Sequence, residues 1–283
     1  PSRRHHDKCR EKMKARLLIL LLCSTFISSL AATGGNDASD ELNRLFGRLN
    51  SKIPDQEKIL VNDSIISIID SYVRSDSIFT HEFAGLKFLG QIKSGDSKMK
   101  IVSWNMLLRE SPARYFCYFI NRRKEGNKIL GLTADYSSEN IRTDTVYSPE
   151  NWYGALYYDL RPVKRGNETF WMLLGIDYGN PAITRKVIDV LSFTPGDDPV
   201  FGKKWFNDGT NVKYREVLEY SFTAVISLRF MSDKLIVFDH LVPISPVHAN
   251  NREFYGPDFS YDAYRFEKGI WQLKINVDAR NEE

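Results

Sequence analysis

The amino-acid sequence predicts a mainly β (α+β) protein in which an antiparallel meander forms a sandwich or an irregular barrel, preceded by two N-terminal helices. Aromatic residues make up 13% of the 283 residues, and such side chains favour the half-buried surface of a pleated sheet. Beyond residue 83, apolar and polar residues alternate with the period of a strand. Turn-forming residues separate these runs, as in a series of hairpins.

The formal charge of +3 is concentrated in the first 31 residues, which hold seven Lys and Arg residues against two acidic ones. The remainder of the chain therefore carries about −2. A body close to neutrality has no electrostatic basis for binding nucleic acid, so we expect no nucleic-acid partner.

These first 31 residues comprise upstream sequence and a predicted secretory signal peptide. Lys14 and Arg16 precede the apolar stretch Leu17–Ile27, and small residues follow up to Ala32. This order of charge, apolar stretch and small residues is typical of a cleaved leader and too short for a permanent membrane helix. We therefore expect an exported protein of the periplasm or outer cell surface. The one expected route to a membrane is a lipid anchor at Cys23, the alternative exit of the leader.

Residues 32–82 are predicted to form a tether followed by two helices. The small and polar residues 32–41 suggest the tether, with Asp40 as the cap of the first helix. Apolar residues at helical spacing predict a second helix from about Gln56 to Val73, after a break at Pro54. The two helices either pack on the β body or form a short stalk.

Residues 83–283 are predicted to form one antiparallel β domain with ten to twelve strands up to Asp278. The clearest alternation runs from Val217 to Phe230 and predicts one long strand with one wet face. Cys117 is the only cysteine left after leader cleavage and lies among apolar residues, so we expect it in the core. The turn signals between strands are Ser94–Asp96, Lys124–Asn127, Arg165–Asn167, Asp208–Gly209, Ser232–Asp233 and Lys268–Gly269.

Familiar catalytic signatures are missing from the sequence. It holds no nucleophile elbow, zinc-binding helix, phosphate-binding loop, dinucleotide fingerprint or Cys-x-x-Cys pair. We therefore predict no cofactor and no metal, and the catalytic residues, if any, stay unknown. Paired carboxylates of a glycosidase leave no local sequence pattern, so that chemistry remains open.

Three segments supply the candidate ligand-binding residues. Asp239 shares a predicted strand face with apolar residues, where a buried carboxylate needs a partner; it either contacts a ligand or accepts backbone N–H groups at a strand end. His240 is expected on the opposite face as a surface or cross-strand residue. The segment 255–262 combines aromatic rings with carboxylates, which suits a sugar, a Ca²⁺ ion or a turn held to the core. Trp152 and Tyr153 lie in a third, aromatic segment and either line a cleft or supply cross-strand packing. The candidate residues are Asp239, Tyr255, Asp258, Tyr261, Asp262, Trp152 and Tyr153.

Six segments of the β body together carry a resemblance to known proteins. They are Trp152–Asp159, Leu173–Asp177, Lys186–Leu191, Pro199–Gly202, Ile236–Leu241 and Phe254–Asp262. With these segments, roughly residues 84–281 resemble a group of exported Bacteroidetes proteins of uncharacterised function. The resemblance implies an envelope or surface setting, but no activity or site residue.

We therefore expect an exported, non-enzymatic envelope or surface module that binds a glycan, a peptide or an envelope protein. The alternative is a hydrolase of polysaccharide or cell wall that uses a carboxylate pair drawn from Asp177, Asp239, Asp258 and Asp262. A purely structural subunit would instead show a large exposed apolar patch.

Overall fold

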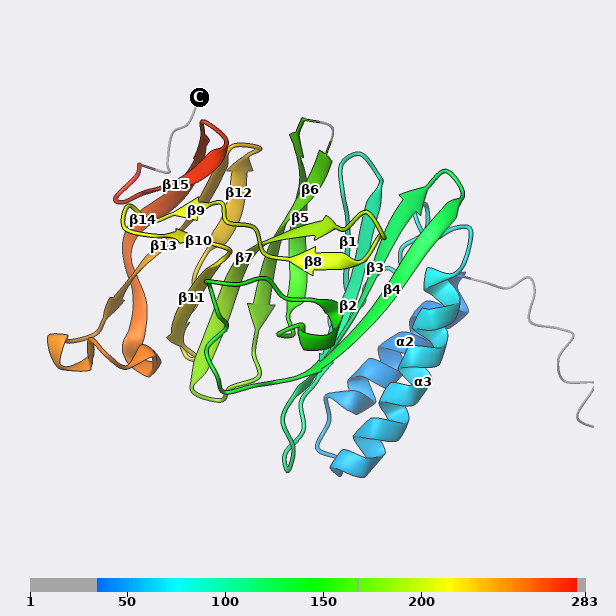
Figure 1. Cartoon of the computed structure of the whole chain (residues 1–283). Helices are drawn as coiled ribbons and strands as arrows, with labels where there is room; N and C mark the ends of the chain where they lie inside the picture. Colours follow the sequence, from blue (N-terminus) through cyan, green and yellow to red (C-terminus); the bar gives the residue numbers. More distant parts are fainter. Residues whose placement is uncertain (1–34, 167, 279–283) are drawn as a thin grey trace, which may run out of the picture.

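The computed structural model describes residues 35–166 and 168–278, and this part of the chain is mainly β, with 45% strand and 17% helix. Helices and sheets follow one another as layers across the molecule, with both helices at one side (Figure 1). The predicted leader with Cys23, the first tether residues and Asn167 of one predicted turn lie outside the described residues.

The two helices are α2 (Gly35–Leu49) and α3 (Asp55–Val73). The predicted cap at Asp40 is wrong, because α2 already begins at Gly35 and the described part of the predicted tether is helical. Asp37 lies in the first turn, where a negative charge stabilises the helix N-terminus. The second helix matches its predicted range within one residue.

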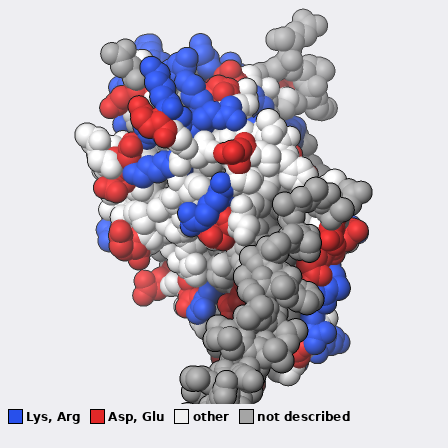
Figure 2. Space-filling model, turned by 90° about the vertical axis from the view of Figure 1, so that its right-hand side faces the viewer, with Lys and Arg blue, Asp and Glu red and all other residues white. Residues whose placement is uncertain are grey.

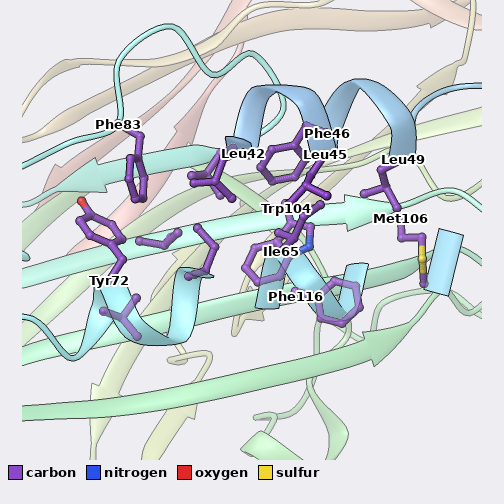
Figure 3. Packing of buried hydrophobic residues seen from close by; sticks show 14 of the residues in the cluster. Leu42, Leu45, Phe46, Leu49, Ile65, Tyr72, Phe83, Trp104, Met106 and Phe116 are labelled. Carbon is purple, nitrogen blue, oxygen red and sulfur yellow. The ribbon is translucent and has the colours of Figure 1, made fainter. Parts of the chain in front are cut away.

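The helices pack on the first sheet and are therefore part of the body. Leu42, Phe46 and Ile65 are fully buried against Trp104 and Phe116 of the sheet (Figure 3). The indole N–H of Trp104 donates to the Asn62 side chain across 2.8 Å, which positions α3 on the sheet. No helix among the described residues is long and apolar enough to cross a membrane.

Three sheets contain the fifteen strands of the described residues. The first sheet has the order β1-β2-β3-β4, the second β11-β7-β6-β5 with β8 beside β7, and the third β10-β9-β15-β14-β13-β12. Neighbours pair antiparallel except β15 and β9, which are parallel. The first-sheet strands are β1 (Gly90–Lys93), β2 (Met99–Met106), β3 (Arg114–Arg123) and β4 (Gly126–Asp135). The second-sheet strands are β5 (Leu156–Arg165), β6 (Glu168–Asp177), β7 (Ile183–Phe193), β8 (Pro199–Phe201) and β11 (Glu216–Ser221). The third-sheet strands are β9 (Phe206–Asn207), β10 (Val212–Lys213), β12 (Leu228–Ser232), β13 (Leu235–Pro243), β14 (Tyr255–Glu267) and β15 (Ile270–Lys274).

The second sheet is buried on both faces. On β6, Trp171 and Leu173 pack with residues of the first sheet, whereas Met172 and Leu174 pack with residues of the third. This double burial explains why β6 is almost continuously apolar rather than alternating. Cys117 lies in the first of these two inter-sheet cores and is fully buried, which confirms its predicted place.

The prediction of one long strand from Val217 to Phe230 is wrong. Strand β11 ends at Ser221 in the second sheet, and β12 begins at Leu228 in the third. Leu218, Leu228 and Phe230 nevertheless contribute to the same core, because the chain crosses from one sheet to the other around it. The alternation of apolar and polar residues therefore identified the buried face, but it could not show that the chain passes from one sheet to another. The predicted count of ten to twelve strands was low because β8, β9 and β10 have only two or three residues.

The turn signals are confirmed where the structure describes them. Each of the six segments connects two consecutive antiparallel strands, as at Lys124 between β3 and β4 and at Gly269 between β14 and β15. Gly269 adopts φ +83°, a left-handed conformation that glycine adopts without steric cost.

Candidate functional site

The core between the second and third sheets becomes polar at one end. Leu218 on β11 and Phe238 on β13 belong to this core. Glu216 lies two residues before Leu218, and His240 lies two residues after Phe238. Both line the adjoining cleft, as does Asp262 of β14. Glu216 alternates with Leu218 and Asp262 pairs directly with Phe238, so the pleat that buries these apolar residues also turns both carboxylates inward, whereas His240 lies at an irregularity of β13.

This end of the core forms a cleft of about 330 Å³, which we call the acidic cleft. Five of its lining residues are acidic and two are Lys or Arg, so the cleft favours cations or neutral hydroxyl-bearing ligands over anions. Apolar side chains from both sheets contribute part of its wall. The lining residues are Asp208, Lys213, Glu216, Val217, Leu218, Glu219, Phe238, Asp239, His240, Leu241, Arg252, Asp262 and Leu273.

A histidine and an aspartate from adjacent strands form a pair in this cleft. His240 Nδ1 lies 2.8 Å from Asp262 Oδ2, and Asp262 Oδ1 accepts the backbone N–H of Asn276 across 3.1 Å. Asp262 is buried, whereas His240 is about one-third exposed. The carboxylate thus holds one ring nitrogen, and the ring remains partly accessible from the cleft. This arrangement confirms the cross-strand prediction for His240.

A second polar group joins the β9–β10 hairpin to β11. The Lys213 ammonium lies 2.9 Å from Glu216 and 3.1 Å from Asp208. Burial opposes the charge on Lys213, but the two carboxylates together raise the pKa of Lys213 above its ordinary value. Tyr264 donates its hydroxyl to Glu216, and burial, followed by the Glu216 charge, raises the pKa of Tyr264, so the phenol stays protonated.

Asp239 has one of the two roles that its sequence context suggested, because its carboxylate accepts a backbone N–H group. It lines the cleft, and its Oδ2 accepts the backbone N–H of Ser227 across 2.7 Å. The bond runs to the preceding β11–β12 connection rather than to the following loop. A β-bulge lies between Asp239 and Leu241, so these two residues do not share a face as predicted, and Leu241 packs with the inter-sheet core.

The segment predicted as a turn around Pro257 is instead part of β14 and contains a local irregularity. Ser260 donates its hydroxyl and its backbone N–H to Asp258, and these bonds, with a smaller contribution from His240, hold the pKa of Asp258 below its ordinary range. Phe259 has φ +69° and is 94% exposed. A bulky residue in this left-handed conformation, with its ring in solvent, contributes little to folding.

The two predicted tyrosines of this segment do not line the acidic cleft. Tyr255 is buried in the inter-sheet core, and its hydroxyl donates to the Ala249 carbonyl across 2.6 Å. Tyr261 packs on the outer face of the third sheet beside Leu235 and Val237. Among the predicted residues, the structure thus brings Asp239 and Asp262 together, with Asp258 near them through His240.

Trp152 and Tyr153 lie in the other inter-sheet layer. They precede β5 rather than form part of it, and Trp152 is only 4% exposed. Tyr153 donates to Asp189 Oδ2 across 2.9 Å, and Arg215 Nε donates to the same oxygen across 3.0 Å. We call Tyr153, Asp189 and Arg215 the buried network. Of the two roles considered for these aromatic residues, packing inside the protein fits the structure, although neither residue belongs to a strand.

Asp177, the fourth carboxylate of the predicted hydrolase pool, lies apart from the acidic cleft. Burial raises the pKa of Asp177, although Tyr115 and the backbone of Gly179 both donate to it. Arg185 lies between Asp177 and Glu219, at 3.5 Å and 2.9 Å from the two carboxylates. Asp177 is therefore part of a buried ion-pair chain and does not join Asp239, Asp258 and Asp262.

Sequence reasoning missed Glu216, Lys213 and Asp208. The sequence did contain a signal for Glu216, because it lies two residues before Leu218 and so falls on the buried face of the predicted strand. No comparable pattern marks Lys213 and Asp208, whose positions depend on the pairing of the short strands β9 and β10. Within the described residues, no group of three or more His, Cys, Asp or Glu is arranged to hold a metal ion.

Exposed apolar side chains gather on two neighbouring loops. Phe222 and Val225 lie on the β11–β12 connection, and Ile244 and Val247 lie between β13 and β14. Ile244 and Thr223 line one shared pocket, which places the two loops side by side.

Comparison with known proteins gave no family model that matches the chain, and neither the curated proteins nor the solved structures yielded a match.

Proposed function

We propose that this protein is an exported, non-enzymatic module of the cell envelope or surface, and that its acidic cleft binds a glycan. The observation that carries the proposal is the meeting of Asp239, Asp262 and His240 in one cleft beside the apolar side chains of Phe238 and Leu273. Sugar hydroxyls donate to carboxylates and accept from imidazole, and the C–H face of a sugar ring prefers an apolar surface. Export rests on the leader pattern of the first 31 residues.

The charge of the cleft favours a neutral sugar over an acidic one. Five carboxylates against two cationic side chains would repel a uronic acid or a sulfated sugar. Much of this charge is already paired, as between Lys213 and Glu216, so the cleft offers directed hydrogen bonds more than a strong field. Directed bonds of this kind discriminate between sugar epimers.

Phe259 supplies the aromatic face that such a site needs. It follows Asp258, whose pKa His240 helps to lower, and its ring is almost wholly exposed. Aromatic residues exposed next to polar groups are typical of recognition surfaces. We infer that Phe259 stacks on a sugar bound at the mouth of the cleft.

The test is a titration of the protein with neutral oligosaccharides, followed by calorimetry of the best ligand with variants. Asp262→Asn and Phe259→Ala should each weaken binding about tenfold, because each removes one principal contact. Phe222→Ala and Asp40→Asn are controls outside the cleft, an exposed phenyl ring on another loop and an exposed carboxylate on α2. Absence of binding at millimolar sugar, or equal losses in the controls, would overturn the proposal.

A hydrolase remains the second candidate because carboxylates from two different sheets line the same cleft. Glu216 comes from β11 and Asp262 from β14. Hydrolysis needs two such groups, one acting as acid and the other as base or nucleophile. New reducing ends that disappear in both Glu216→Gln and Asp262→Asn would favour the hydrolase, whereas an unchanged ligand favours the binding module.

A further inference from the structure

A second and larger cleft opens where the first and second sheets meet. It has a volume of about 870 Å³, and we call it the basic groove. It is bounded by the end of β3, the start of β6 and the end of β7, and it shares no lining residue with the acidic cleft. Its lining residues are Lys98, Asn121, Arg122, Arg123, Lys124, Glu168, Thr169, Phe170, Trp171, Ser192, Phe193, Thr194, Pro195, Asp197 and Lys203.

Five Lys and Arg residues line the groove against two acidic residues, which gives it an excess of three positive charges. On the face shown in Figure 2, a group of Lys and Arg side chains gathers at one end of the molecule, and other Lys and Arg side chains are scattered over the rest of that face. The chain beyond residue 31 carries only about −2 in total, so the positive charge is a local feature. A hollow surface with charge of one sign raises the local concentration of the opposite ion.

Most of this charge is not neutralised by neighbouring carboxylates. Lys98 and Lys124 have no ion-pair partner within the described residues, and the Arg122 guanidinium lies over the Phe79 ring at 4.0 Å. The Lys203 ammonium lies over the Phe170 ring at 4.2 Å. An aromatic ring holds a cation in place without cancelling its charge, so these groups stay available to an anion.

One ion pair fixes the rim of the groove. Arg123 pairs with Asp197 of the β7–β8 loop, and Lys128 donates to the Asp197 carbonyl across 2.6 Å. These contacts join the β3–β4 hairpin of the first sheet to a loop of the second. The groove is thus bounded by connected elements rather than by independent surface lysines.

The groove also offers an apolar surface. The Phe193 ring is half-buried and meets the Trp171 ring edge-on at a centroid distance of 5.6 Å. Hydroxyl groups of Thr169, Ser192 and Thr194 lie among the lining residues. Positive charge, an aromatic ring and hydroxyl groups together suit a ligand with anionic groups, C–H faces and many hydroxyls.

We propose that the basic groove binds an anionic polysaccharide, one that carries carboxylate or sulfate groups along its length. The open shape accommodates a segment of a longer chain. A nucleic acid is the less favoured polyanion, because a nucleic-acid-binding domain is normally basic as a whole and this body is not. The proposal concerns a site separate from the acidic cleft and does not depend on the function proposed for that cleft.

Two polyanionic saccharides serve as probes, heparin for sulfate and polygalacturonate for carboxylate, with dextran as the uncharged control. Binding of the full chain is measured at two salt concentrations, since contacts between exposed charges weaken as screening increases. We expect Lys98→Glu with Lys124→Glu to weaken binding to at least one polyanion by about tenfold or more, because each change replaces an attraction by a repulsion.

The matched control is Lys52→Glu with Lys234→Glu, which makes the same change in net charge at exposed residues outside the groove. It should change affinity by less than about threefold, because exposed charges farther away than a Debye length are screened. Circular dichroism of both double variants shows whether the fold is kept. Asp262→Asn should leave polyanion binding unchanged, which separates this site from the acidic cleft.

Three results would overturn the proposal. Equal losses of affinity in the two double variants would mean that the interaction depends only on the net charge of the protein. Single-stranded DNA that binds more tightly than both saccharides, and is weakened by the groove variant, would assign the groove to nucleic acid. Failure of both heparin and polygalacturonate to bind at low salt would remove the polysaccharide ligand.

Discussion

The two inter-sheet layers each contain a polar cluster, and the clusters differ in whether solvent reaches them. In the buried network, Arg215 and Asp189 are fully buried, and the guanidinium also donates to the carbonyls of Arg142, Thr145 and Phe201. In the acidic cleft, His240 is about one-third exposed and faces an open volume of about 330 Å³.

The difference in solvent access distinguishes polar groups that stabilise the fold from polar groups that a ligand can contact. Every charged group of the buried network has its partners inside the protein, and Gly202 at φ +101° leaves the space that the Arg215 guanidinium occupies. A Cβ at position 202 would lie 2.5 Å from that guanidinium, so the network requires a glycine at this position of the backbone. The acidic cleft keeps room beside its paired groups, and a ligand can therefore compete for them.

The largest expected effect comes from removing the cation of the buried network. Arg215→Met should lower the free energy of unfolding by about 3–5 kcal/mol, because Asp189 is left buried without its partner. Urea denaturation measures the change, and Arg44→Met, on an arginine with 63% side-chain exposure, is the control. A loss similar to that of the control would mean that the network is not structural.

Removing a single hydroxyl from the same network should have a smaller effect. Tyr153→Phe keeps the ring and deletes the donor to Asp189, so we expect a loss of about 1–2 kcal/mol in the free energy of unfolding. Tyr261→Phe is the control, because the Tyr261 hydroxyl makes no hydrogen bond within the described residues. Equal urea midpoints for the two variants would contradict the place assigned to Tyr153.

The fold class and the turns could be predicted from local sequence patterns, but the assignment of strands to the three sheets could not. Helical spacing and turn residues located α3 and the six turn segments, because those signals are local. The partition of strands among three sheets depends on contacts between distant segments. The alternation from Val217 to Phe230 therefore located a buried face and still concealed the crossing at Phe222.

The candidate site was predictable only where a carboxylate interrupts an apolar strand. Asp239 met that condition and lines the acidic cleft, and Asp262 came from the aromatic and acidic segment beside it. Trp152 and Tyr153 did not reach a cleft, because clustered aromatic residues occur equally in cores. The basic groove was not predicted, since the run Arg122–Lys124 resembles an ordinary surface hairpin and the other two cations, Lys98 and Lys203, come from distant segments.

The acidic cleft should tolerate a change that the buried network does not. Asp262→Asn keeps the shape of the side chain and an oxygen for the Asn276 backbone, so we expect a stability loss of about 1 kcal/mol or less. Urea denaturation beside Arg215→Met gives the comparison directly. A loss as large as that of Arg215→Met would make the His240 pair a structural element and weaken its assignment as a ligand site.

The smallest expected effect is a change in the titration of Asp258 near the cleft. Its pKa is lowered mainly by the hydroxyl and backbone N–H of Ser260. Because the folded pKa lies below the unfolded one, ionised Asp258 stabilises the fold above the unfolded pKa, and this contribution is lost as the pH falls through the folded pKa. Ser260→Ala removes the hydroxyl donor, so the pKa of Asp258 should rise toward its ordinary value and the acid-side loss of stability should shrink. Carboxyl NMR titration of both proteins measures the shift, with Ser64→Ala on α3 as the control. An unchanged Asp258 pKa in Ser260→Ala would mean that the irregular stretch of β14 does not hold this carboxylate in place beside His240.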